Sequence, residues 1–419
     1  MKADTANRSI IAVAGVLMQI ALGAVYAWSV FRIPLSQAYG WTVSQVTVAF
    51  ELAILVLGFA AFAGGLWMSR VGPRRVASLG AVLYGLGTAL AGTSHSLTML
   101  YLTYGVIGGA GLGLGYIVPV ATLVRWFPDK RGMITGIAVA GFGAGALVTA
   151  PVAQRLIASV GVSSTFVILG IAYFVIIMFA ATVMKNPPEG YAPRGFQRSS
   201  VRGSSAQDFT LPQALRSWQW YGLWLTLFLN STAGIAIISQ ASPMAQEISH
   251  ASVAAAAALV GIISIANGSG RFLWAWFSDA IGRKAVFLTM FLLQAVAFLL
   301  LSHVSGFVSL TVLAFIILLC YGGGFGTMPA FAADYFGAKD IGSIYGLMLT
   351  AWGAAGVVGP TLIAQVRQAT GAYQDALKIM ALMTLLSVIV PLLLHPPVLR
   401  RMPSARDSDL ESVRQRIAS

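Results

Sequence analysis

Ser69-Arg-Val-Gly72-Pro-Arg74 and, 210 residues further on, Asp279-Ala-Ile-Gly282-Arg-Lys284 are two versions of one short pattern. A second pair of segments consists of Trp126-Phe-Pro-Asp-Lys130-Arg-Gly132 and Tyr335-Phe-Gly-Ala-Lys339-Asp-Ile-Gly342. Three further residues return at the same interval, namely Gly136 as Gly346, Gly143 as Gly353 and Pro151 as Pro360. The offset stays at 209 to 210 residues, which indicates an internal repeat that covers both halves of the chain.

Long apolar segments lie between these motifs. The chain has 419 residues, of which 58% are apolar and only 9% are charged, whereas soluble domains carry charges on about 25% of their residues. A helix needs about 20 consecutive apolar residues to cross the hydrocarbon core of a bilayer. The sequence predicts twelve such helices, which begin near Ile10, Val46, Val76, Leu97, Gly132, Ser164, Tyr221, Val253, Ala285, Phe307, Ile341 and Ala376.

The positions of the repeated motifs predict how these helices are grouped. Six predicted helices separate the two copies of each motif, so both copies lie on the same side of the membrane. We therefore expect an all-α membrane protein of two six-helix bundles, related by a pseudo-two-fold axis along the membrane normal. The expected divisions are a bundle at 1–184, a cytoplasmic linker at 185–216, a bundle at 217–397 and a cytoplasmic tail at 398–419. Such bundles are suited to alternating access around a site between them.

The net charge of +13 could indicate a nucleic-acid-binding protein, so the placement of the basic residues decides the matter. With a cytoplasmic N-terminus, 21 of the 26 Lys and Arg residues fall in cytoplasmic segments and four in outer segments, at Arg32, Arg155, Arg367 and Lys378. This asymmetry is the positive-inside rule. It predicts a multi-pass protein of a bacterial-type inner membrane with both termini in the cytoplasm, and no nucleic-acid partner.

Several classes of protein lack their usual motifs here. Cys320 is the single cysteine, so no disulfide framework or Cys-based metal site is expected. Glycines four residues apart, such as Gly105 and Gly109, are typical of closely packed membrane helices. They could also suggest a phosphate-binding loop, but such loops follow a strand and no Gly-Lys-Ser/Thr occurs. ATP-driven transport is therefore not expected, and no cofactor is predicted. An enzyme is not expected either, since the four His residues show no metal-ligand spacing.

Arg271 is the one basic residue predicted inside a helix, about eight residues from the cytoplasmic end of helix 8. A charge at this depth costs roughly 3 kcal/mol on insertion scales. The guanidinium could reach back to the headgroups, but Asn267 and Ser264 stand one and two turns earlier on the same face and form a polar stripe. A planar donor fork in a dry cleft matches a carboxylate. Arg271, with Asn267, is therefore predicted to bind an anion.

Glu51 in helix 2 is the only acid that the sequence places clearly inside the membrane, since Glu247 and Asp334 lie near helix ends. Glu51 is near the outer face and Arg271 nearer the inner face, so no direct ion pair between them is expected. Burial raises the pKa of a carboxyl group, and Glu51 is a candidate proton carrier. The alternative is a neutral Glu hydrogen-bonded between helices.

Aromatic and amide side chains complete the predicted site. Tyr26, Tyr116 and Tyr321 lie in the interiors of helices 1, 4 and 10, and Asn230 is a polar residue within helix 7. Phe325 and Trp352 belong to the same group. Taken singly, each aromatic residue could instead be packing or part of an interfacial belt. One cation with a few hydroxyls and otherwise apolar walls suits a short anion with an apolar tail.

The chain resembles the major facilitator superfamily, in which the loops after helices 2 and 8 carry an acid, a glycine and paired basic residues. The second copy fits through Asp279, Gly282, Arg283 and Lys284, and the first departs with Ser69 in place of the acid. Three strings narrow the resemblance to the oxalate/formate antiporter and monocarboxylate porter branch. They are Tyr26-Ala-Trp-Ser-Val-Phe31, Arg125-Trp-Phe-Pro-Asp-Lys-Arg-Gly132 and Asn186-Pro-Pro-Glu-Gly-Tyr191.

The resemblance implies roles for particular residues. Arg271 is similar to the helix 8 arginine that binds the substrate carboxylate, and Tyr26, Tyr116 and Tyr321 match aromatic cavity positions. The oxalate/formate antiporter has a lysine in helix 11 for a second carboxylate, and Trp352 stands at that position here. Animal monocarboxylate porters place an aspartate of the proton path four residues before the arginine, where this chain has Asn267. One cation favours a substrate with one carboxylate.

These observations lead to a hypothesis and its rivals. We expect a monomeric secondary transporter that carries lactate, pyruvate or a similar monocarboxylate together with a proton. The nearest alternative is an exchanger of dicarboxylate for monocarboxylate, such as oxalate for formate. A membrane receptor that binds the anion without moving it and a channel are further alternatives. The lack of a sizeable soluble domain argues against a receptor.

Overall fold

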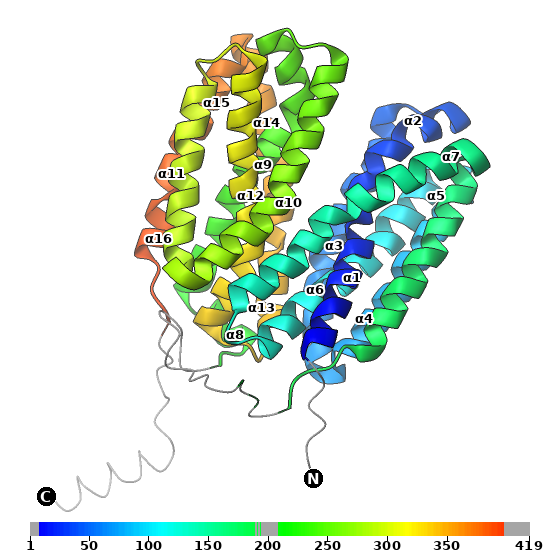
Figure 1. The fold of residues 1–419 in the computed structure, drawn as a ribbon, viewed down its shortest axis with the longest axis vertical. Helices are drawn as coiled ribbons and strands as arrows, with labels where there is room; N and C mark the ends of the chain where they lie inside the picture. Colours follow the sequence, from blue (N-terminus) through cyan, green and yellow to red (C-terminus); the bar gives the residue numbers. More distant parts are fainter. Residues whose placement is uncertain (1–7, 189–190, 192, 194–207, 398–419) are drawn as a thin grey trace, which may run out of the picture.

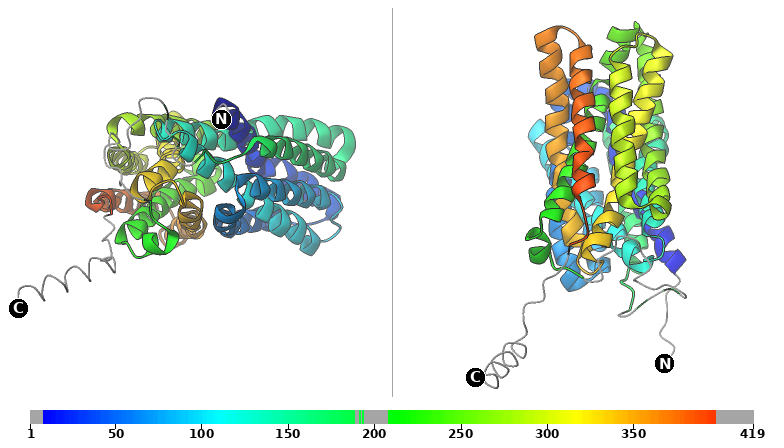
Figure 2. Two further views of the ribbon diagram at one scale, coloured as in Figure 1. Left: turned by 90° about the horizontal axis from the view of Figure 1, so that it is seen from below. Right: turned by 90° about the vertical axis from the view of Figure 1, so that its left-hand side faces the viewer.

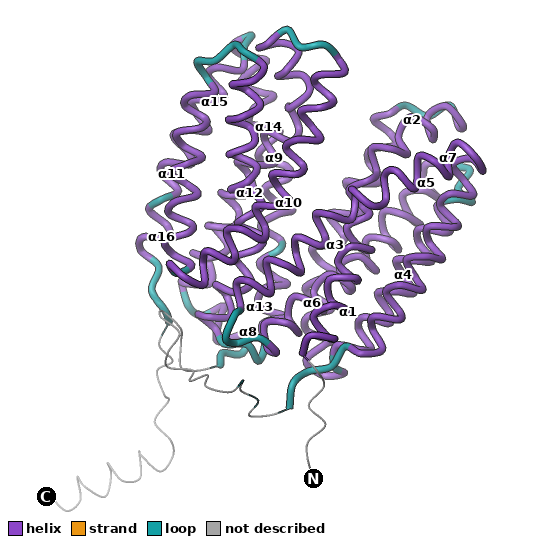
Figure 3. The backbone as a smooth tube through the Cα atoms, viewed as in Figure 1, coloured by secondary structure: helices purple, strands orange, loops and turns teal. Residues whose placement is uncertain are grey.

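The protein was analysed as a computed structural model, which describes residues 8–188, 191, 193 and 208–397. Helices account for all the regular structure of this part of the chain (Figure 3). Ten of its helices are long and apolar enough to cross a membrane. Large apolar side chains are exposed on the outer surface, for example Val308 at 75% and Phe179 at 73%. A surface of this kind is suited to contact with lipid tails rather than water.

Twelve spans result once two features of the described residues are considered. Helix α7 runs from Arg131 to Val183, but Gly161 within it has a φ of 80° and separates two membrane-length segments. This left-handed conformation is easily adopted only by glycine. Helix α4 (Pro73–Ala91) is shorter and carries two arginines at its start, yet it runs the length of its bundle (Figure 1). All twelve segments begin within three residues of the predicted positions, so the predicted fold class is confirmed.

The first bundle contains α1 to α7. Its first span combines α1 (Arg8–Leu22), the 3₁₀ segment η1 (Gly23–Ala27) and α2 (Trp28–Tyr39), and its second is α3 (Val43–Val71). After α4, the fourth span combines α5 (Leu97–Leu100), the π-helical segment η2 (Tyr101–Gly108) and α6 (Gly109–Trp126). Helix α7 supplies the fifth and sixth spans. Pro34, Pro119 and Pro151 lie inside these helices, where neighbouring helices compensate for the missing backbone hydrogen bonds.

The second bundle follows the short helix α8 (Leu211–Leu215). It contains α9 (Trp218–Ser249), α10 (Val253–Ile281), α11 (Arg283–Leu301) and α12 (Phe307–Phe336). Its fifth span is α13 (Ile341–Met348) followed by α14 (Thr350–Thr370), and its last is α15 (Tyr373–Ser387) followed by α16 (Ile389–Leu393). The predicted tail at 398–419 and most of the predicted linker at 185–216 lie outside the described residues.

The two bundles stand side by side and diverge toward one end (Figures 1 and 2). We call this the open end; it carries the α2–α3 connection and Gly161. The opposite end, which carries the α6–α7 and α12–α13 connections, is called the closed end. Bonds between the bundles cluster there. Arg131 pairs with Asp334 at 2.8 Å. The Asp279 carboxylate accepts hydrogen bonds from the backbone N–H groups of Gly132 (2.9 Å) and Met133 (2.7 Å).

A charge network extends inward from this pair. Arg283 bonds to both Asp279 (2.6 Å) and Asp334 (2.9 Å), so two acids and two arginines are linked. Asp279 of the second bundle thus caps the N-terminus of α7 in the first, where the helix dipole favours a negative charge. Nearby, Arg125 donates to the backbone carbonyls of Ala338 and Lys339. The closed end is therefore fastened by charge-assisted bonds that join the two bundles.

The symmetry-related contact, between α3 and α13, has no ion pair among the residues that the structure describes. Ser69 stands at the position matching Asp279, and its hydroxyl donates to the backbone carbonyl of Leu66 in its own helix at 2.7 Å. Helices α3 and α13 instead meet through glycines, because a Cβ added at Gly65 would overlap the Gly342 carbonyl. The repeat thus produces two contacts of the same geometry, one ionic and one apolar.

Candidate functional site

Arg271 lies on α10 at the interface between the bundles. Gly136 of α7 and Gly326 of α12 both press against the α10 backbone at this position, where a Cβ on either would lie within 3 Å of the Arg271 carbonyl oxygen. These glycines allow three helices to meet at the arginine. The side chain is 1% exposed. It is therefore buried between helices, and the alternative of a guanidinium that reaches the headgroups is not what the structure shows.

Few protein groups bind the guanidinium. Its Nε donates to Asn267 Oδ1 at 3.2 Å, one turn earlier on α10, and Nη2 donates to the Tyr26 hydroxyl at 3.4 Å across the bundle interface. Among the described residues, none of the ion pairs includes Arg271. A buried charge without an opposite charge is strongly destabilising unless a partner is supplied. The arginine thus retains capacity to bind an anion.

Aromatic rings surround the guanidinium on two sides. Its central carbon lies 5.1 Å from the centre of the Phe325 ring in the second bundle and 5.9 Å from that of Phe142 in the first. Cations are attracted to the faces of aromatic rings at such distances. These rings hold the positive charge in place without neutralising it, which leaves its hydrogen-bond donors available to a ligand.

The two rings belong to matched aromatic groups, one in each bundle. Tyr26 and Tyr116 contact Phe142 edge-on, with ring centres 5.2 Å and 5.1 Å apart. In the second bundle, Tyr321 and Trp352 contact Phe325 at 5.2 Å and 5.4 Å. Trp352 Nε1 also donates to the Tyr321 hydroxyl at 3.1 Å. The internal repeat relates Phe142 to Trp352 and Tyr116 to Phe325, so one arrangement of helices generates both groups.

Asn230 connects two helices of the second bundle. Its side chain is fully buried, and Nδ2 donates to the backbone carbonyl of Tyr321 at 3.1 Å, which ties α9 to α12. Gln19 makes the matching bond in the first bundle, from Nε2 to the Tyr116 carbonyl at 3.4 Å. Within the described residues, the side-chain oxygens of both amides have no hydrogen-bond partner. These amides therefore hold the helices that carry Tyr116 and Tyr321.

Glu51 is not brought to the arginine. It lies on α3, eight residues from the start of that helix at the open end, and its side chain is exposed. Among the described residues, Glu51 has no hydrogen bond or ion pair, so the alternative of a Glu hydrogen-bonded between helices is wrong for this conformation. Of the predicted site, the structure unites Arg271, Asn267, Tyr26 and Phe325, with Trp352, Tyr321, Tyr116 and Asn230 around them.

Sequence reasoning missed Phe142 and Gln19. The signal for Phe142 was present, because it precedes Trp352 by 210 residues in a pair of helices already matched through Gly143 and Gly353. Gln19 has no comparable signal, since a buried amide that braces two helices resembles any other polar residue within an apolar segment. Its role depends on which carbonyl the fold places opposite it.

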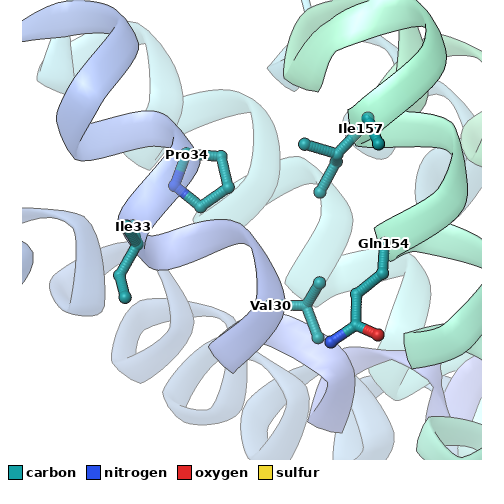
Figure 4. Close-up of a pocket in the computed structure, with 6 residues that line it drawn as sticks. Val30, Ile33, Pro34, Gln154 and Ile157 are labelled. Atoms are coloured by element: carbon teal, nitrogen blue, oxygen red, sulfur yellow. The ribbon is translucent and has the colours of Figure 1, made fainter.

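A separate cavity lies away from the arginine. About 340 Å³ in volume, it sits between α2 and α7 and is lined by Val30, Ile33, Pro34, Gln154, Ile157 and Ala158 (Figure 4). Gln154 supplies its only polar side chain, so it offers no charge to an anion. The arginine cluster itself is closed, with Phe325 2% and Trp352 8% exposed. A ligand reaches Arg271 only when the surrounding side chains or the bundles move.

Comparison of the sequence with known protein families identifies the family of this chain. A family model described as the Major Facilitator Superfamily matches residues 11–360 and, in a second match, residues 223–418. The chain belongs to the major facilitator superfamily. Proteins of this superfamily are membrane transporters rather than enzymes, which confirms the expected class and a multi-pass membrane location.

Three relatives narrow the resemblance. The chain is 32% identical to the uncharacterized MFS-type transporter YhjX of Escherichia coli (strain K12), over 82% of this chain and 84% of the relative. It is 27% identical to the oxalate:formate antiporter of Oxalobacter formigenes, over 84% of this chain and 82% of that protein. It is 25% identical to apicoplast pyruvate carrier 1 of Toxoplasma gondii, over 78% of this chain and 70% of that protein. These similarities confirm the branch predicted from the sequence motifs.

Proposed function

We propose that this member of the major facilitator superfamily carries a small monocarboxylate of the lactate or pyruvate type, with a proton, by alternating access. The observation that carries the proposal is Arg271, a buried guanidinium between the bundles that has hydrogen-bond donors but no acidic partner in the described part of the chain. A carboxylate would bind this fork through charge-assisted hydrogen bonds. The rings of Phe142 and Phe325 would contact a short apolar tail.

The single charge of the site favours one carboxylate over two. Trp352 stands beside Phe325 and bonds to Tyr321, where a second cation would be needed for a dicarboxylate. A carboxylate bound to Arg271 gives a pair with no net charge, and a neutral loaded complex crosses a low-dielectric interface more readily than a charged one. We further propose that the protein acts as a monomer in a bacterial-type inner membrane, with both termini cytoplasmic and Glu51 as the proton-coupling residue.

Uptake into liposomes tests this function. The purified chain is reconstituted, and labelled L-lactate or pyruvate is supplied outside with an acidic exterior or with equal pH on both sides. We expect saturable uptake that rises above the external concentration only with the gradient. If no saturable uptake of either substrate occurs, the proposed substrate class is wrong. If uptake occurs but ignores the gradient, proton symport is wrong.

Exchange of oxalate for formate is the second candidate, because one relative carries that name. Liposomes loaded with formate distinguish the two functions. An exchanger takes up labelled oxalate only when formate is inside, whereas the proposed symporter needs no internal substrate. Uptake that depends wholly on internal formate would favour the exchanger.

Replacing Trp352 with lysine is expected to shift the preference toward dicarboxylates. The ammonium group would add a second positive charge within the aromatic group next to Arg271, and one charge-assisted bond contributes about 1.5–3 kcal/mol, or about tenfold or more in relative affinity. Competition by oxalate and lactate for ligand-induced thermal stabilisation measures the change. Trp352→Phe is the matched control, since it removes the indole without adding charge. An unchanged oxalate-to-lactate ratio would contradict the one-cation argument.

A further inference from the structure

Tyr345 of α13 has a buried hydroxyl group that the protein itself does not use. The side chain is fully buried, and its hydroxyl oxygen has no hydrogen-bond partner among the residues that the structure describes. A buried polar group without a partner is destabilising, and such groups are rare in folded proteins. If the ring served only for packing, a phenylalanine would fill the same space without this cost. The hydroxyl group therefore points to a partner from outside the protein.

The backbone contacts of α13 place Tyr345 at the depth of Arg271. A Cβ on Gly346, the next residue along, would lie 2.8 Å from the Ala61 carbonyl oxygen of α3. A Cβ on Gly136 of α7 would lie 2.9 Å from the Arg271 carbonyl oxygen. The repeat interval of 210 residues relates the two glycines to each other and Ala61 to Arg271. The two contacts are therefore equivalent, and Tyr345 lies level with the arginine at the other edge of the bundle interface.

Thr135 shows how the repeat-related hydroxyl group is satisfied. It stands 210 residues before Tyr345, and its hydroxyl donates across the interface to the Gly326 carbonyl of α12 at 2.9 Å. Tyr345 instead lies close to Tyr116 of α6, the helix that the repeat relates to α12. The two tyrosines are neighbours, but their hydroxyl groups do not have the geometry of a hydrogen bond. The protein completes the polar contact at one edge of the interface and leaves it open at the other.

The tyrosine hydroxyls near Arg271 differ in whether the protein binds them. In the described part of the chain, the tyrosines that interact electrostatically with this arginine are Tyr26, Tyr116, Tyr321 and Tyr345. The Tyr26 hydroxyl accepts from Arg271 at 3.4 Å, and the Tyr321 hydroxyl accepts from Trp352 at 3.1 Å. The Tyr345 hydroxyl accepts from neither. The hydroxyl group left for a ligand thus lies where α6 and α13 meet.

The backbone around Tyr345 is held by neighbouring helices. Trp220 Nε1 of α9 donates to the Ile344 carbonyl at 3.3 Å, and Gly346 presses on α3. Helix α13 ends at Met348, one residue before the start of α14, which carries Trp352. Tyr345 is therefore fixed against α3 and α9 and does not depend on the position of α14. A donor that is already in place loses little conformational freedom when a ligand binds.

We propose that the Tyr345 hydroxyl, with Tyr116 beside it, binds the oxygen on the carbon next to the substrate carboxylate, so that the protein selects 2-oxo and 2-hydroxy monocarboxylates over unsubstituted ones. This inference rests on the proposed transport of a monocarboxylate. The donor fork of Arg271 binds both oxygens of a carboxylate, which leaves the oxygen on the adjacent carbon as the next polar atom. A tyrosine hydroxyl donates to a keto oxygen and either donates to or accepts from a hydroxyl group.

A neutral oxygen suits this subsite better than a second carboxylate. The groups that interact with the Tyr345 hydroxyl are Tyr116 and Arg271, and the proposed function already assigns the arginine to the first carboxylate. A second carboxylate would be buried beside neutral hydroxyl groups without a cation of its own, which is unfavourable. The subsite therefore adds a choice among monocarboxylates to the preference for one carboxylate.

Ligand-induced thermal stabilisation of the purified full-length protein tests this subsite. The probes are pyruvate, L-lactate and propionate, which differ in the substituent on the carbon next to the carboxylate. We expect the wild type to bind pyruvate and lactate about tenfold more tightly than propionate. Tyr345→Phe removes the hydroxyl and keeps the ring. It should weaken pyruvate and lactate about five- to tenfold, as expected for one neutral hydrogen bond, and leave propionate within twofold.

Tyr104→Phe is the matched control. Tyr104 of η2 is also buried, but its ring packs against Trp28 at 4.2 Å inside the first bundle. Its removal should leave the ratio of pyruvate to propionate affinity unchanged. If Tyr345→Phe weakens all three ligands equally, the hydroxyl binds the carboxylate itself and the proposed subsite is wrong. An unchanged ratio with Tyr345→Phe would also overturn it.

The melting temperature without ligand separates a binding role from a structural one. Because the Tyr345 hydroxyl has no partner among the described residues, Tyr345→Phe should melt at the wild-type temperature or above it. A lower melting temperature together with unchanged discrimination between pyruvate and propionate would show that the hydroxyl stabilises the fold instead. That result would contradict the proposal.

The wild-type protein distinguishes failure of this subsite from failure of the proposed function. If none of the three monocarboxylates stabilises it, the proposed substrate class is wrong, and the subsite is wrong with it. If all three stabilise it equally, the monocarboxylate site stands and only the selection by Tyr345 is refuted. Tighter binding of pyruvate and lactate that disappears with Tyr345→Phe supports both.

Discussion

Replacing Arg271 with glutamine is expected to lower carboxylate uptake at subsaturating substrate by about 100-fold. The substitution removes the buried charge and the guanidinium donors that bond to Asn267 and Tyr26, and leaves a shorter polar side chain in their place. Loss of one partner from a buried, charge-assisted pair costs about 2–5 kcal/mol, and 100-fold corresponds to about 2.8 kcal/mol. Initial uptake rates of labelled lactate or pyruvate into liposomes provide the measurement.

Two variants separate the role of the charge from that of the geometry. Arg271→Lys keeps the charge but loses the planar fork, so its uptake should lie between those of the wild type and Arg271→Gln. Arg367→Gln removes an arginine from an exposed pair with Glu247, and uptake should stay within about twofold of the wild type. If Arg271→Gln transports normally while retaining its thermal stability, Arg271 is not the substrate site.

Replacing Asp334 with asparagine is expected to shift the protein strongly toward conformations in which the closed end is open. Asp334 joins Arg131 of the first bundle to Arg283 of the second, and the two arginines are only 4% and 9% exposed. Removal of the shared acid takes away the carboxylate with which Arg131 pairs in the described part of the chain, while Arg283 keeps its pair with Asp279. Breaking a buried pair in this way costs about 3–5 kcal/mol, and separation of the bundles would relieve the penalty by hydrating Arg131.

Thiol labelling reports this shift. Thr135 is fully buried at the closed end, where its hydroxyl donates to the Gly326 carbonyl across the interface at 2.9 Å. With Thr135→Cys as the reporter, Asp334→Asn should raise the labelling rate by about 100-fold. Asp375→Asn, which disrupts an exposed pair with Lys378, should leave the rate unchanged. Equal labelling with and without Asp334→Asn would show that this network does not hold the closed end.

Much of the fold could be predicted from the sequence because membrane helices have strong local signals. Apolar length, Gly and Pro punctuation and the position of basic residues placed all twelve helix starts within three residues. The repeat then paired the helices. What remained open was geometry that local signals do not encode, for example the continuation of α7 across Gly161 within the first bundle, which depends on a single glycine with positive φ.

The candidate site was predictable in part. Arg271 is conspicuous because a charge at membrane depth requires a compensating interaction. The partners of the arginine were harder to predict, since Tyr26 and Phe142 belong to the other bundle and approach it only through packing. Asn230 shows the limit in the other direction. Its polarity suggested a contact with the ligand, and the fold gives its amide a further partner that the sequence does not indicate, the Tyr321 carbonyl at 3.1 Å.

The aromatic groups of the two bundles are nearly symmetric, but the arginine is not, because its repeat counterpart in α3 is Ala61. A molecule bound between the bundles would therefore have a fixed polarity, with its carboxylate toward α10 and its other end toward Phe142 and Tyr116. Changes at the two ends of a substrate then probe different halves of the protein. Chemical variation of the tail reports on the first bundle, and variation of the acid group on the second.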